Sequence, residues 1–425
     1  MPDPWQITTL SNGLRVVTQT IPTAQSASVN IFAGVGSRAE TKRVNGVSHY
    51  LEHMLFKGTP SRPTAIIVSE QVEGAGGTLN AYTSREVTCY WDLVPYDRFE
   101  TGMDVLCDIY LNALLEQEEV ERERNVVQQE IKRSKDSPGS WAAELAAEAV
   151  FGDQPIGWPI AGTEETVAGI SREDQAEHIA TWYGPNNSVI SVGGNVTHEQ
   201  VLTIAERWFG NLSSKELPPV TAANEVISSQ NIRTDHRDIT QCNMQISMYG
   251  LRWDDPDRYA LSILTTVLGR GMSSRLFKEV RERRGLAYSV GAGHQRHKDC
   301  GYLSVSAGVS PENVLEATQV ILAEVGKMRE ELVGDEEMTK ARDYSTGSFR
   351  LGLESSMAVA QRNGDSLTMI GRIEPVEEVI GKLQAVTAED VRNVARRVFR
   401  DDNLAMSMVG PGPDDDALDN VLTLG

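Results

Sequence analysis

Cysteine is scarce in this sequence, and no cysteines form a metal-binding pair. The chain has four, which are scattered and make no C-x-x-C motif: Cys89, Cys107, Cys242 and Cys300. A cysteine-based metal site is therefore not expected. Because unpaired cysteines are among the most buried residue types, we predict buried free thiols at all of these positions.

Positive charge is also in short supply. The chain has 40 Lys and Arg against 60 Asp and Glu, which gives a formal net charge of −20. Nucleic-acid binding requires a basic face, so no nucleic-acid partner is expected. Solubility is the simplest explanation of the acidity, and a site that attracts basic peptides is the alternative.

Long apolar runs are absent. The first residues, 1-MPDPWQITTL-10, show no basic stretch followed by an apolar one, so no signal peptide is expected. No apolar run approaches the roughly 18 residues that a membrane-spanning helix needs. We therefore expect no membrane partner and a cytoplasmic location.

An internal repeat divides the chain. The segments 170-ISREDQAEHIATWYGPNNSVISVGG-194 and 386-VTAEDVRNVARRVFRDDNLAMSMVGP-411 share a Ser or Thr cap followed by Glu-Asp, an amphipathic helix, a polar turn with Asn, and an apolar strand. Ser171 and Thr387 stand 216 positions apart, and so do Asn187 and Asn403. Repetition in register at about half the chain length predicts two similar halves.

The repeat sets the expected domains. We predict an N-terminal domain of residues 1–212, a linker of residues 213–225 and a C-terminal domain of residues 226–425. The linker segment is mostly polar, and Pro218 and Pro219 stiffen it. An ordinary surface loop within one domain is the alternative reading of this stretch.

Both helical and strand periods occur in each half. Strand-like segments are 15–20, 27–34, 87–94 and 302–309. Helix-like segments are 98–115, 118–135 and 312–333. Because strands and long helices interleave and adjacent strands have short connections, we predict an α+β fold, with a largely antiparallel sheet packed with helices in each half.

The stretch 46-GVSHYLEHMLFKGT-59 carries the strongest chemical signal. If Asn45 caps a helix here, His49 and His53 lie four apart on one face and can hold a divalent cation, usually zinc. Glu52 borders the same face and is placed to take a proton from a metal-bound water. This is H-x-x-E-H, the reverse of a common metallopeptidase motif. A surface helix with two stray histidines is the alternative.

A catalytic zinc needs a third protein ligand. The helix expected over residues 118–135 offers Glu123 and Glu130, which are seven apart and therefore nearly on one face. One of them could bind the metal while the other orients a histidine. For either residue taken alone, a solvated acidic helix is the alternative.

Together these residues resemble the inverzincin family of zinc peptidases, which includes pitrilysin, insulin-degrading enzyme and the mitochondrial processing peptidase. In that family a distal glutamate follows the H-x-x-E-H motif and a second glutamate lies seven residues earlier. Here Glu130 follows His53 by 77 positions. The resemblance therefore implies that Glu130 is the third zinc ligand and that Glu123 supports a ligand.

The resemblance covers nearly the whole chain. It includes the segments 77-GTLNAYTSRE-86, 155-PIGWPIAGTEE-165 and 273-SSRLFKEVRERRGLAYSV-290. It is closest to the short bacterial members of the family and to the catalytic subunit of the mitochondrial processing peptidase.

Two further pairs receive a role through this resemblance. In active members an Arg and a Tyr seven residues apart steady the substrate and the developing oxyanion, and Arg281 and Tyr288 match that spacing. On the residues alone, a surface arginine and a core tyrosine are the simpler interpretation. The family's cleft strand places Asn80 and Ala81 near the scissile bond, where an extended peptide can pair with a sheet edge.

The resemblance thus implies a zinc-dependent endopeptidase with one zinc per chain, held by His49, His53 and Glu130. Its substrate would be an unfolded peptide or a leader segment, cleaved inside a closed chamber. Short family members pair, so a homodimer is expected. The alternative is a non-catalytic subunit on the same fold that binds peptides or supports an assembly.

Overall fold

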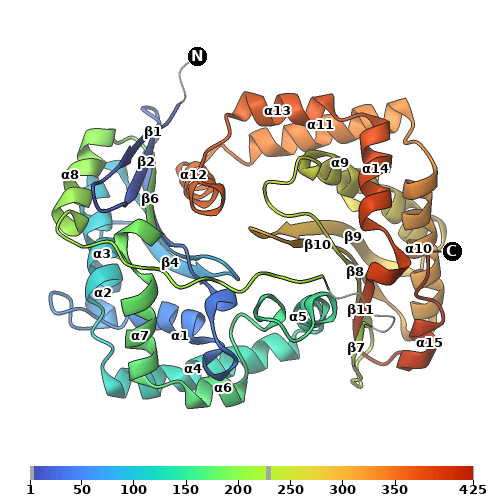
Figure 1. Cartoon of the computed structure of the whole chain (residues 1–425), viewed down its shortest axis with the longest axis horizontal. Coiled ribbons are helices and arrows are strands. Elements are labelled where there is room, and N and C mark those ends of the chain that lie inside the picture. The colour runs from blue at the N-terminus through green and yellow to red at the C-terminus, as the bar shows by residue number, and fades with distance from the viewer. Residues whose placement is uncertain (1–3, 226–230, 425) are drawn as a thin grey trace. The chain divides into compact units, whose positions relative to one another are not determined.

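The computed structural model describes residues 4–225 and 231–424, and the chain forms two compact units, each with its own sheet (Figure 1). The first unit contains Met1–Ile131, Trp158–Thr221 and Leu351–Pro375. The second contains Lys132–Gly157, Ala222–Arg350 and Val376–Gly425. Residues 226–230, where the C-terminal domain was predicted to begin, lie outside the described residues.

The first unit is built on a six-stranded sheet. The strand order is β1 (Gln6–Thr9), β2 (Arg15–Thr20), β6 (Ser188–Gly194), β3 (Ser26–Ala33), β5 (Thr88–Pro95) and β4 (Thr78–Thr83). Only the β2–β6 pair is parallel among these neighbours. Strand β4 therefore lies at an edge of the sheet, with one side of its backbone unpaired by the sheet.

Helices cover both faces of this sheet. They are α1 (Val47–Leu55), α2 (Ala65–Glu73), α3 (Phe99–Asn112), α4 (Gln117–Asp136), α6 (Glu164–Gly169), α7 (Arg172–Trp182), α8 (His198–Phe209) and α12 (Ser356–Ile370). Val16 and Ile31 point into a core shared with α1, α3 and α8, whereas Val17 and Phe32 point to the opposite face, which α12 covers. This alternation is the two-residue period of a strand buried on both sides.

The second unit repeats the plan with a five-stranded sheet. Its order is β7 (Ile232–Asp235), β11 (Leu404–Val409), β8 (Cys242–Tyr249), β10 (Gly301–Val309) and β9 (Ala287–Arg296). Only the β7–β11 pair is parallel, so both sheets are largely antiparallel, as predicted. Its helices are α5 (Pro138–Phe151), α9 (Arg258–Gly269), α10 (Val314–Glu330), α11 (Asp335–Leu351), α13 (Val376–Ala385), α14 (Ala388–Val398) and α15 (Asp415–Asp419).

The repeated helix–turn–strand is present in both units. Ser171 caps α7 by accepting a hydrogen bond from the backbone N–H of Asp174, and Thr387 caps α14 through Asp390 in the same way. Each helix is followed by a short turn and then by the buried strand β6 or β11. The predicted α+β fold with two similar sheet-and-helix units is confirmed.

One helix is exchanged in each direction between the sequence halves. Helix α5 comes early in the chain, yet it packs on β8 and β11 of the second unit. Helix α12 comes late in the chain, yet it packs on β3 and β6 of the first unit. A single boundary at residues 213–225 assigns α5 and α12 to the wrong sheets. Local sequence patterns do not indicate which sheet a helix covers.

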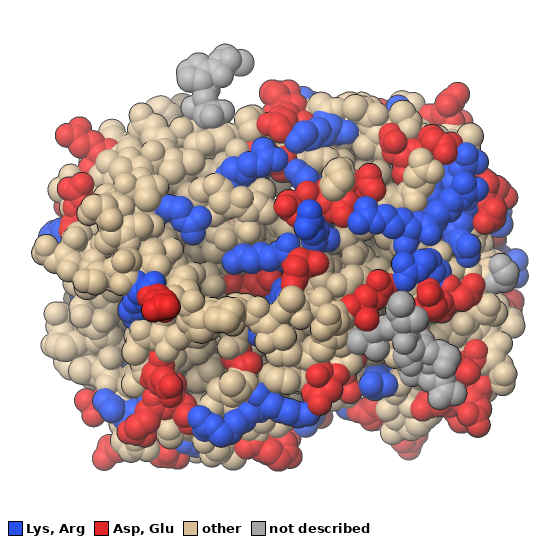
Figure 2. Space-filling view, in the orientation of Figure 1, with Lys and Arg blue, Asp and Glu red and all other residues tan. Residues whose placement is uncertain are grey.

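The composition also led to expectations about surface charge, cysteine burial and membrane-spanning helices. The face shown in Figure 2 has acidic and basic side chains interspersed, so the acidic surplus is not gathered into one patch on that face. All four cysteines are free and buried, as predicted. Within residues 4–225 and 231–424, no helix combines the length and the apolarity that crossing a bilayer requires.

The seating of α12 leaves no room for a side chain at Gly364. A Cβ atom there would lie 2.1 Å from a ring carbon of Phe32. Gly364→Ala should therefore destabilise the protein by about 1–3 kcal/mol through overpacking, although alanine favours a helix by about 1 kcal/mol. Urea unfolding provides the measurement. Gly381→Ala in α13 is the matched control, since its Cβ meets nothing within 4 Å, and it should stabilise. Equal effects of the two changes would contradict the close packing.

Asp92 on β5 is fully buried, and one of its carboxylate oxygens has no hydrogen-bond partner within the described residues. Burial raises the pKa of Asp92 from 3.8 to about 8, although the backbone N–H of Val29 opposes the shift. Between these two values the folded protein keeps a proton that the unfolded chain has released. The free energy of unfolding therefore falls as the pH rises through this window.

Asp92→Asn removes this titration. From pH 5 to pH 8.5, wild type should lose stability relative to the variant, with a ceiling of about 4 kcal/mol. Urea unfolding at several pH values gives the difference. Asp97→Asn, at an exposed position, should parallel wild type at every pH. A constant gap between wild type and Asp92→Asn would be inconsistent with a buried neutral carboxyl.

Candidate metal centre

Helix α1 presents one face to the core and another to the candidate site. Tyr50, Leu51 and Met54 are fully buried in the core of the first unit. His49 and His53 lie on the less buried side, with side-chain exposures of 18% and 16%. The spacing of four residues that predicted a shared face thus holds, because the apolar residues between the histidines anchor the opposite face.

The start of α1 differs from the prediction. Asn45 does not cap the helix: its side-chain amide donates to Glu40 and to the carbonyl of Pro159. The buried carboxylate of Glu40 takes the capping role instead, accepting from the backbone N–H of Gly46 at 2.7 Å and of Ser48 at 2.8 Å. Glu40 could not be identified as the cap from the sequence, because it lies upstream of the turn that leads into the helix and not at the usual capping position. Burial raises the pKa of Glu40 to about 7, against the opposing hydrogen bonds.

Gly46 is required at the helix start for two reasons. Its φ of +99° lies in the left-handed region, which favours glycine. A Cβ atom would also lie 2.5 Å from the carbonyl oxygen of Ala161. The segment 155–165, noted for its family resemblance, therefore packs directly against the beginning of the helix that carries the histidines.

The predicted ligands meet at one point. The carboxylate oxygen Oε2 of Glu130, on α4, lies 3.6 Å from His49 Nε2 and 3.3 Å from His53 Nε2. One ligand atom from each of the three residues lies within 4.8 Å of the others. In the described part of the chain, this is the group of histidine and acidic side chains with the geometry to hold a metal ion.

A second carboxylate supports His53 from behind. Glu123 Oε1 lies 2.8 Å from His53 Nδ1, and Glu123 Oε2 pairs with Lys57 Nζ at 2.5 Å. Glu123 lies two helical turns before Glu130 on α4, as the seven-residue spacing predicted. Because His53 Nδ1–H is bound to Glu123, Nε2 is the nitrogen left to face a cation.

Local charge favours a cation between the three ligands. Burial lowers the pKa of His53, but its hydrogen bond to Glu123 and its interactions with Glu130 outweigh burial and raise it to about 9. Burial, with His53 beside it, lowers the pKa of His49 to about 4, so its ring is neutral at pH 7. His49 Nδ1 is buried without a partner among the described residues, whereas Nε2 faces Glu130.

This donor set fits zinc. Two imidazole nitrogens and one carboxylate oxygen are the ligands of many catalytic zinc sites, which keep a further position open. The carboxylate that holds the second nitrogen of a ligand histidine is a common supporting feature of such sites. Both features are present here, in His49, His53 and Glu130 and in Glu123 respectively.

Glu52 lies beside the candidate ligands and is held by the edge strand. Thr83 Oγ1 on β4 donates to Glu52 Oε2 at 2.6 Å. Burial raises the pKa of Glu52, while this hydrogen bond opposes the rise. Asn80 and Ala81 lie on the same edge strand, opposite Trp91 and Tyr90 of β5. Sequence reasoning missed Thr83, although it lies only two positions after Ala81 and hence on the same face of the strand.

Arg281 and Tyr288 lie together in the second unit. Arg281 belongs to a short helical segment, Phe277–Arg283, and Tyr288 lies near the start of β9 with 78% of its surface exposed. The guanidinium of Arg281 lies 5.4 Å from the centre of the Tyr288 ring. Tyr288 is therefore not the core residue that the alternative expected, and both side chains face solvent. Their proposed contact with a substrate stays a prediction.

Comparison with known proteins gives two family matches. Residues 15–164 match the family described as insulinase, peptidase family M16. Residues 169–344 match a family described as the peptidase M16 inactive domain. The first match contains all of the predicted zinc ligands, and the second begins after them.

Relatives align over nearly the whole chain. A protein of Streptomyces coelicolor named as an uncharacterized zinc protease is 37% identical over 416 residues, covering 96% of this chain and 90% of that protein. The zinc protease YmxG of Bacillus subtilis, also named as uncharacterized, is 33% identical over 403 residues, covering 95% and 97%. The crystal structure of a Helicobacter pylori protease has a TM-score of 0.88 at 23% identity, covering 96% of this chain and 99% of that one, which shows a common fold.

The contact between Glu123 and His53 makes a testable contribution to metal affinity. Glu123→Gln keeps an acceptor for His53 but removes the charge that favours a cation at the ring. Zinc affinity, measured by competition with a chromophoric chelator, should fall about 10- to 100-fold. Glu118→Gln, at an exposed position of the same helix, should leave the affinity unchanged. Unchanged affinity in Glu123→Gln would remove this residue from the metal centre.

Proposed function

Since the chain belongs to peptidase family M16, the insulinase family, we propose that it is a zinc-dependent endopeptidase that cleaves unfolded peptides. The observation that carries the proposal is the convergence of His49, His53 and Glu130, with Glu52 beside them. The names of the relatives, zinc proteases from two bacterial genera, support the same activity.

Zinc bound by the three ligands supplies Lewis acidity toward a water molecule and a peptide carbonyl. In the proposal, side chains of this chain transfer the proton and hold the reacting groups in position. Glu52 accepts a proton from the attacking water and passes it to the leaving amine, as a general base and then a general acid. Thr83 fixes the Glu52 carboxylate through its 2.6 Å hydrogen bond, and Glu123 keeps His53 oriented.

Strand β4 is the proposed binding edge for the substrate. An extended peptide can pair with the free backbone groups of an edge strand, which gives affinity with little dependence on side chains. Asn80 and Ala81 would then lie beside the scissile bond, near Glu52. Arg281 and Tyr288 are proposed to grip the substrate and to donate to the developing oxyanion.

The finer parts of the proposal concern the setting of the reaction. Two copies of the chain would enclose the substrate in a chamber that excludes folded proteins, and leader segments are one candidate substrate. A cytoplasmic location belongs to the same proposal. These parts are supported by the resemblance to short bacterial family members.

A non-catalytic subunit is the competing function. The description of the second matched family as an inactive domain suits it at first sight. That match, however, covers residues after the metal ligands, and the candidate metal set in the first unit is complete. A chain that served only as a scaffold would have no need of Glu52 and Glu123 beside two histidines.

The decisive measurement is metal content together with hydrolysis of a quenched fluorescent peptide, before and after chelation. We expect about one zinc per chain, loss of hydrolysis on chelation and recovery on adding zinc. Binding of intact peptide without stoichiometric metal or hydrolysis would favour the scaffold.

Glu52→Gln separates metal binding from chemistry. Zinc content should be unchanged, because Glu52 is not among the three converging ligands, while kcat should fall at least about 100-fold. Glu70→Gln, an exposed carboxylate on α2, serves as the control and should retain wild-type rates. Wild-type turnover by Glu52→Gln would refute the assigned proton transfer.

A further inference from the structure

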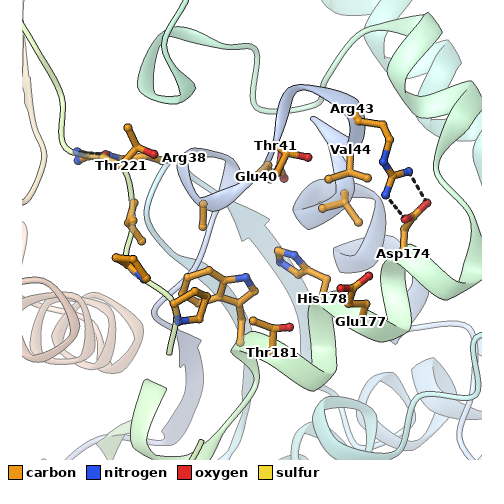
Figure 3. Close-up of a pocket in the computed structure, with 16 residues that line it drawn as sticks. Arg38, Glu40, Thr41, Arg43, Val44, Asp174, Glu177, His178, Thr181 and Thr221 are labelled. Carbon is orange, nitrogen blue, oxygen red and sulfur yellow. Dashed lines mark hydrogen bonds and ion pairs between the residues drawn. The ribbon is translucent and has the colours of Figure 1, made fainter. Parts of the chain in front are cut away.

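Two pockets of this chain differ in whether the polar side chains at them are already paired. The larger one, with a volume of about 410 Å³, lies in the first unit between the segment before α1 and helix α7 (Figure 3). There Arg43 donates two hydrogen bonds to Asp174, and the ring of His178 is hydrogen-bonded to Ser48. Because these groups are satisfied within the protein, they select no ligand.

The smaller pocket lies in the second unit, on the face of the sheet beside α5. Its volume of about 260 Å³ is below the range of sites for drug-sized ligands and suits a single side chain. Asn243 and Gln245 of β8, Ser306 of β10 and Ser289 of β9 supply its polar side chains. In the sheet Ser306 lies opposite Gln245, and Gly308 lies between Asn243 and Ser289, so all four side chains share one face.

Within the described residues, none of these four polar side chains forms a hydrogen bond, and no charged residue lines the pocket. A group that enters such a site displaces water and has to replace the hydrogen bonds that water makes. An apolar group cannot replace them, and a charged group would meet no opposite charge. The pocket therefore favours an uncharged group that both donates and accepts hydrogen bonds.

Two glycines keep the pocket open. Gly308 lies in the middle of the polar face, and a Cβ atom there would lie 3.0 Å from Ser289 Oγ. Gly139, in the first turn of α5, lines the pocket from the helix, and a Cβ atom there would lie 3.5 Å from Asn243 Oδ1. A glycine inside a strand often marks a place that a ligand approaches closely.

We propose that this pocket holds the side-chain carboxamide of a glutamine or an asparagine in an extended peptide. A carboxamide carries two N–H donors and an oxygen acceptor, and it therefore matches the amides of Asn243 and Gln245. The backbone of an extended peptide pairs with a sheet edge, whereas a pocket on the sheet face accepts a side chain.

The pocket is next to the pair that is proposed to grip the substrate. Ser289, which lines the pocket, directly follows Tyr288 on the edge strand β9. A peptide held at Tyr288 can therefore place a neighbouring side chain in the pocket. That this peptide is a substrate rests on the proposed function, whereas binding of the carboxamide does not.

Three capped peptides that differ in one side chain test the proposal. They are acetyl-Gly-Gln-Gly-amide and its counterparts with glutamate or norleucine in the middle. Each is titrated at pH 7.5 against the full chain carrying Glu52→Gln, chosen so that no probe is hydrolysed, and binding is followed by saturation-transfer NMR. The glutamine peptide should bind about tenfold more tightly than the other two. Equal binding of the three peptides, or no binding of the glutamine peptide, would overturn the proposal.

Variants locate the carboxamide. Gln245→Met keeps the size of the side chain but removes its donors and its acceptor, so the preference for glutamine should fall to within about twofold. Gln295→Met, at an exposed position of β9 outside the pocket, should keep the preference.

A filling variant provides an independent check. Gly139→Leu projects toward Asn243 and should abolish the preference while the thermal unfolding midpoint is retained. Gly347→Leu on α11, where a Cβ atom meets nothing within 4 Å, should leave it unchanged. A preference that survives both Gln245→Met and Gly139→Leu in the folded protein would place the carboxamide elsewhere.

Hydrolysis by the wild-type chain separates this inference from the proposed function. Hydrolysis of a quenched fluorescent peptide, with no preference for glutamine in binding, would contradict the pocket alone. Glutamine-selective binding by a chain that hydrolyses no peptide would support the pocket and contradict the peptidase alone.

Discussion

The burial of one face of α1 determines where the chemistry of this protein lies. Tyr50, Leu51 and Met54 fill the core, and their packing turns His49 and His53 toward Glu130. Glu40 fixes the start of the same helix through two backbone N–H groups. The ligand positions are thus set by the hydrophobic core and by a buried cap, so little reorganisation has to accompany metal binding.

Those parts of the site that follow from helix periodicity were accessible from the sequence. The four-residue spacing of His49 and His53 and the seven-residue spacing of Glu123 and Glu130 each fix a shared face, whatever the rest of the fold does. The convergence of the two helices required the family resemblance. Contacts between segments that only the folded chain brings together could not be predicted from the sequence. Glu40 caps α1 in place of Asn45, and Thr83 donates to Glu52 from a strand more than thirty positions away.

The repeated helix–turn–strand of the fold could be predicted from the sequence, whereas the placement of two helices could not. The capped helices α7 and α14 and the strands after them were visible as a pattern, because capping and strand alternation are local. The choice of sheet for α5 and α12 was not visible, since both are ordinary helices whose partners lie far away in the sequence. The same layered plan then supports different surfaces: a candidate metal centre in one unit and an exposed Arg–Tyr pair in the other.

The exchange of α12 has a consequence for how the chain is made. Val17, Phe32, Cys89 and Val189 lie on the sheet face that the segment around α12 covers. During synthesis that face stays open until residues 351–375 have left the ribosome, long after the strands themselves are complete. The first unit therefore cannot finish folding before the second is nearly synthesised, in contrast to the usual order in which an N-terminal domain folds first. Separately expressed sequence halves would each lack a covering helix, because α12 belongs to the first unit and α5 to the second.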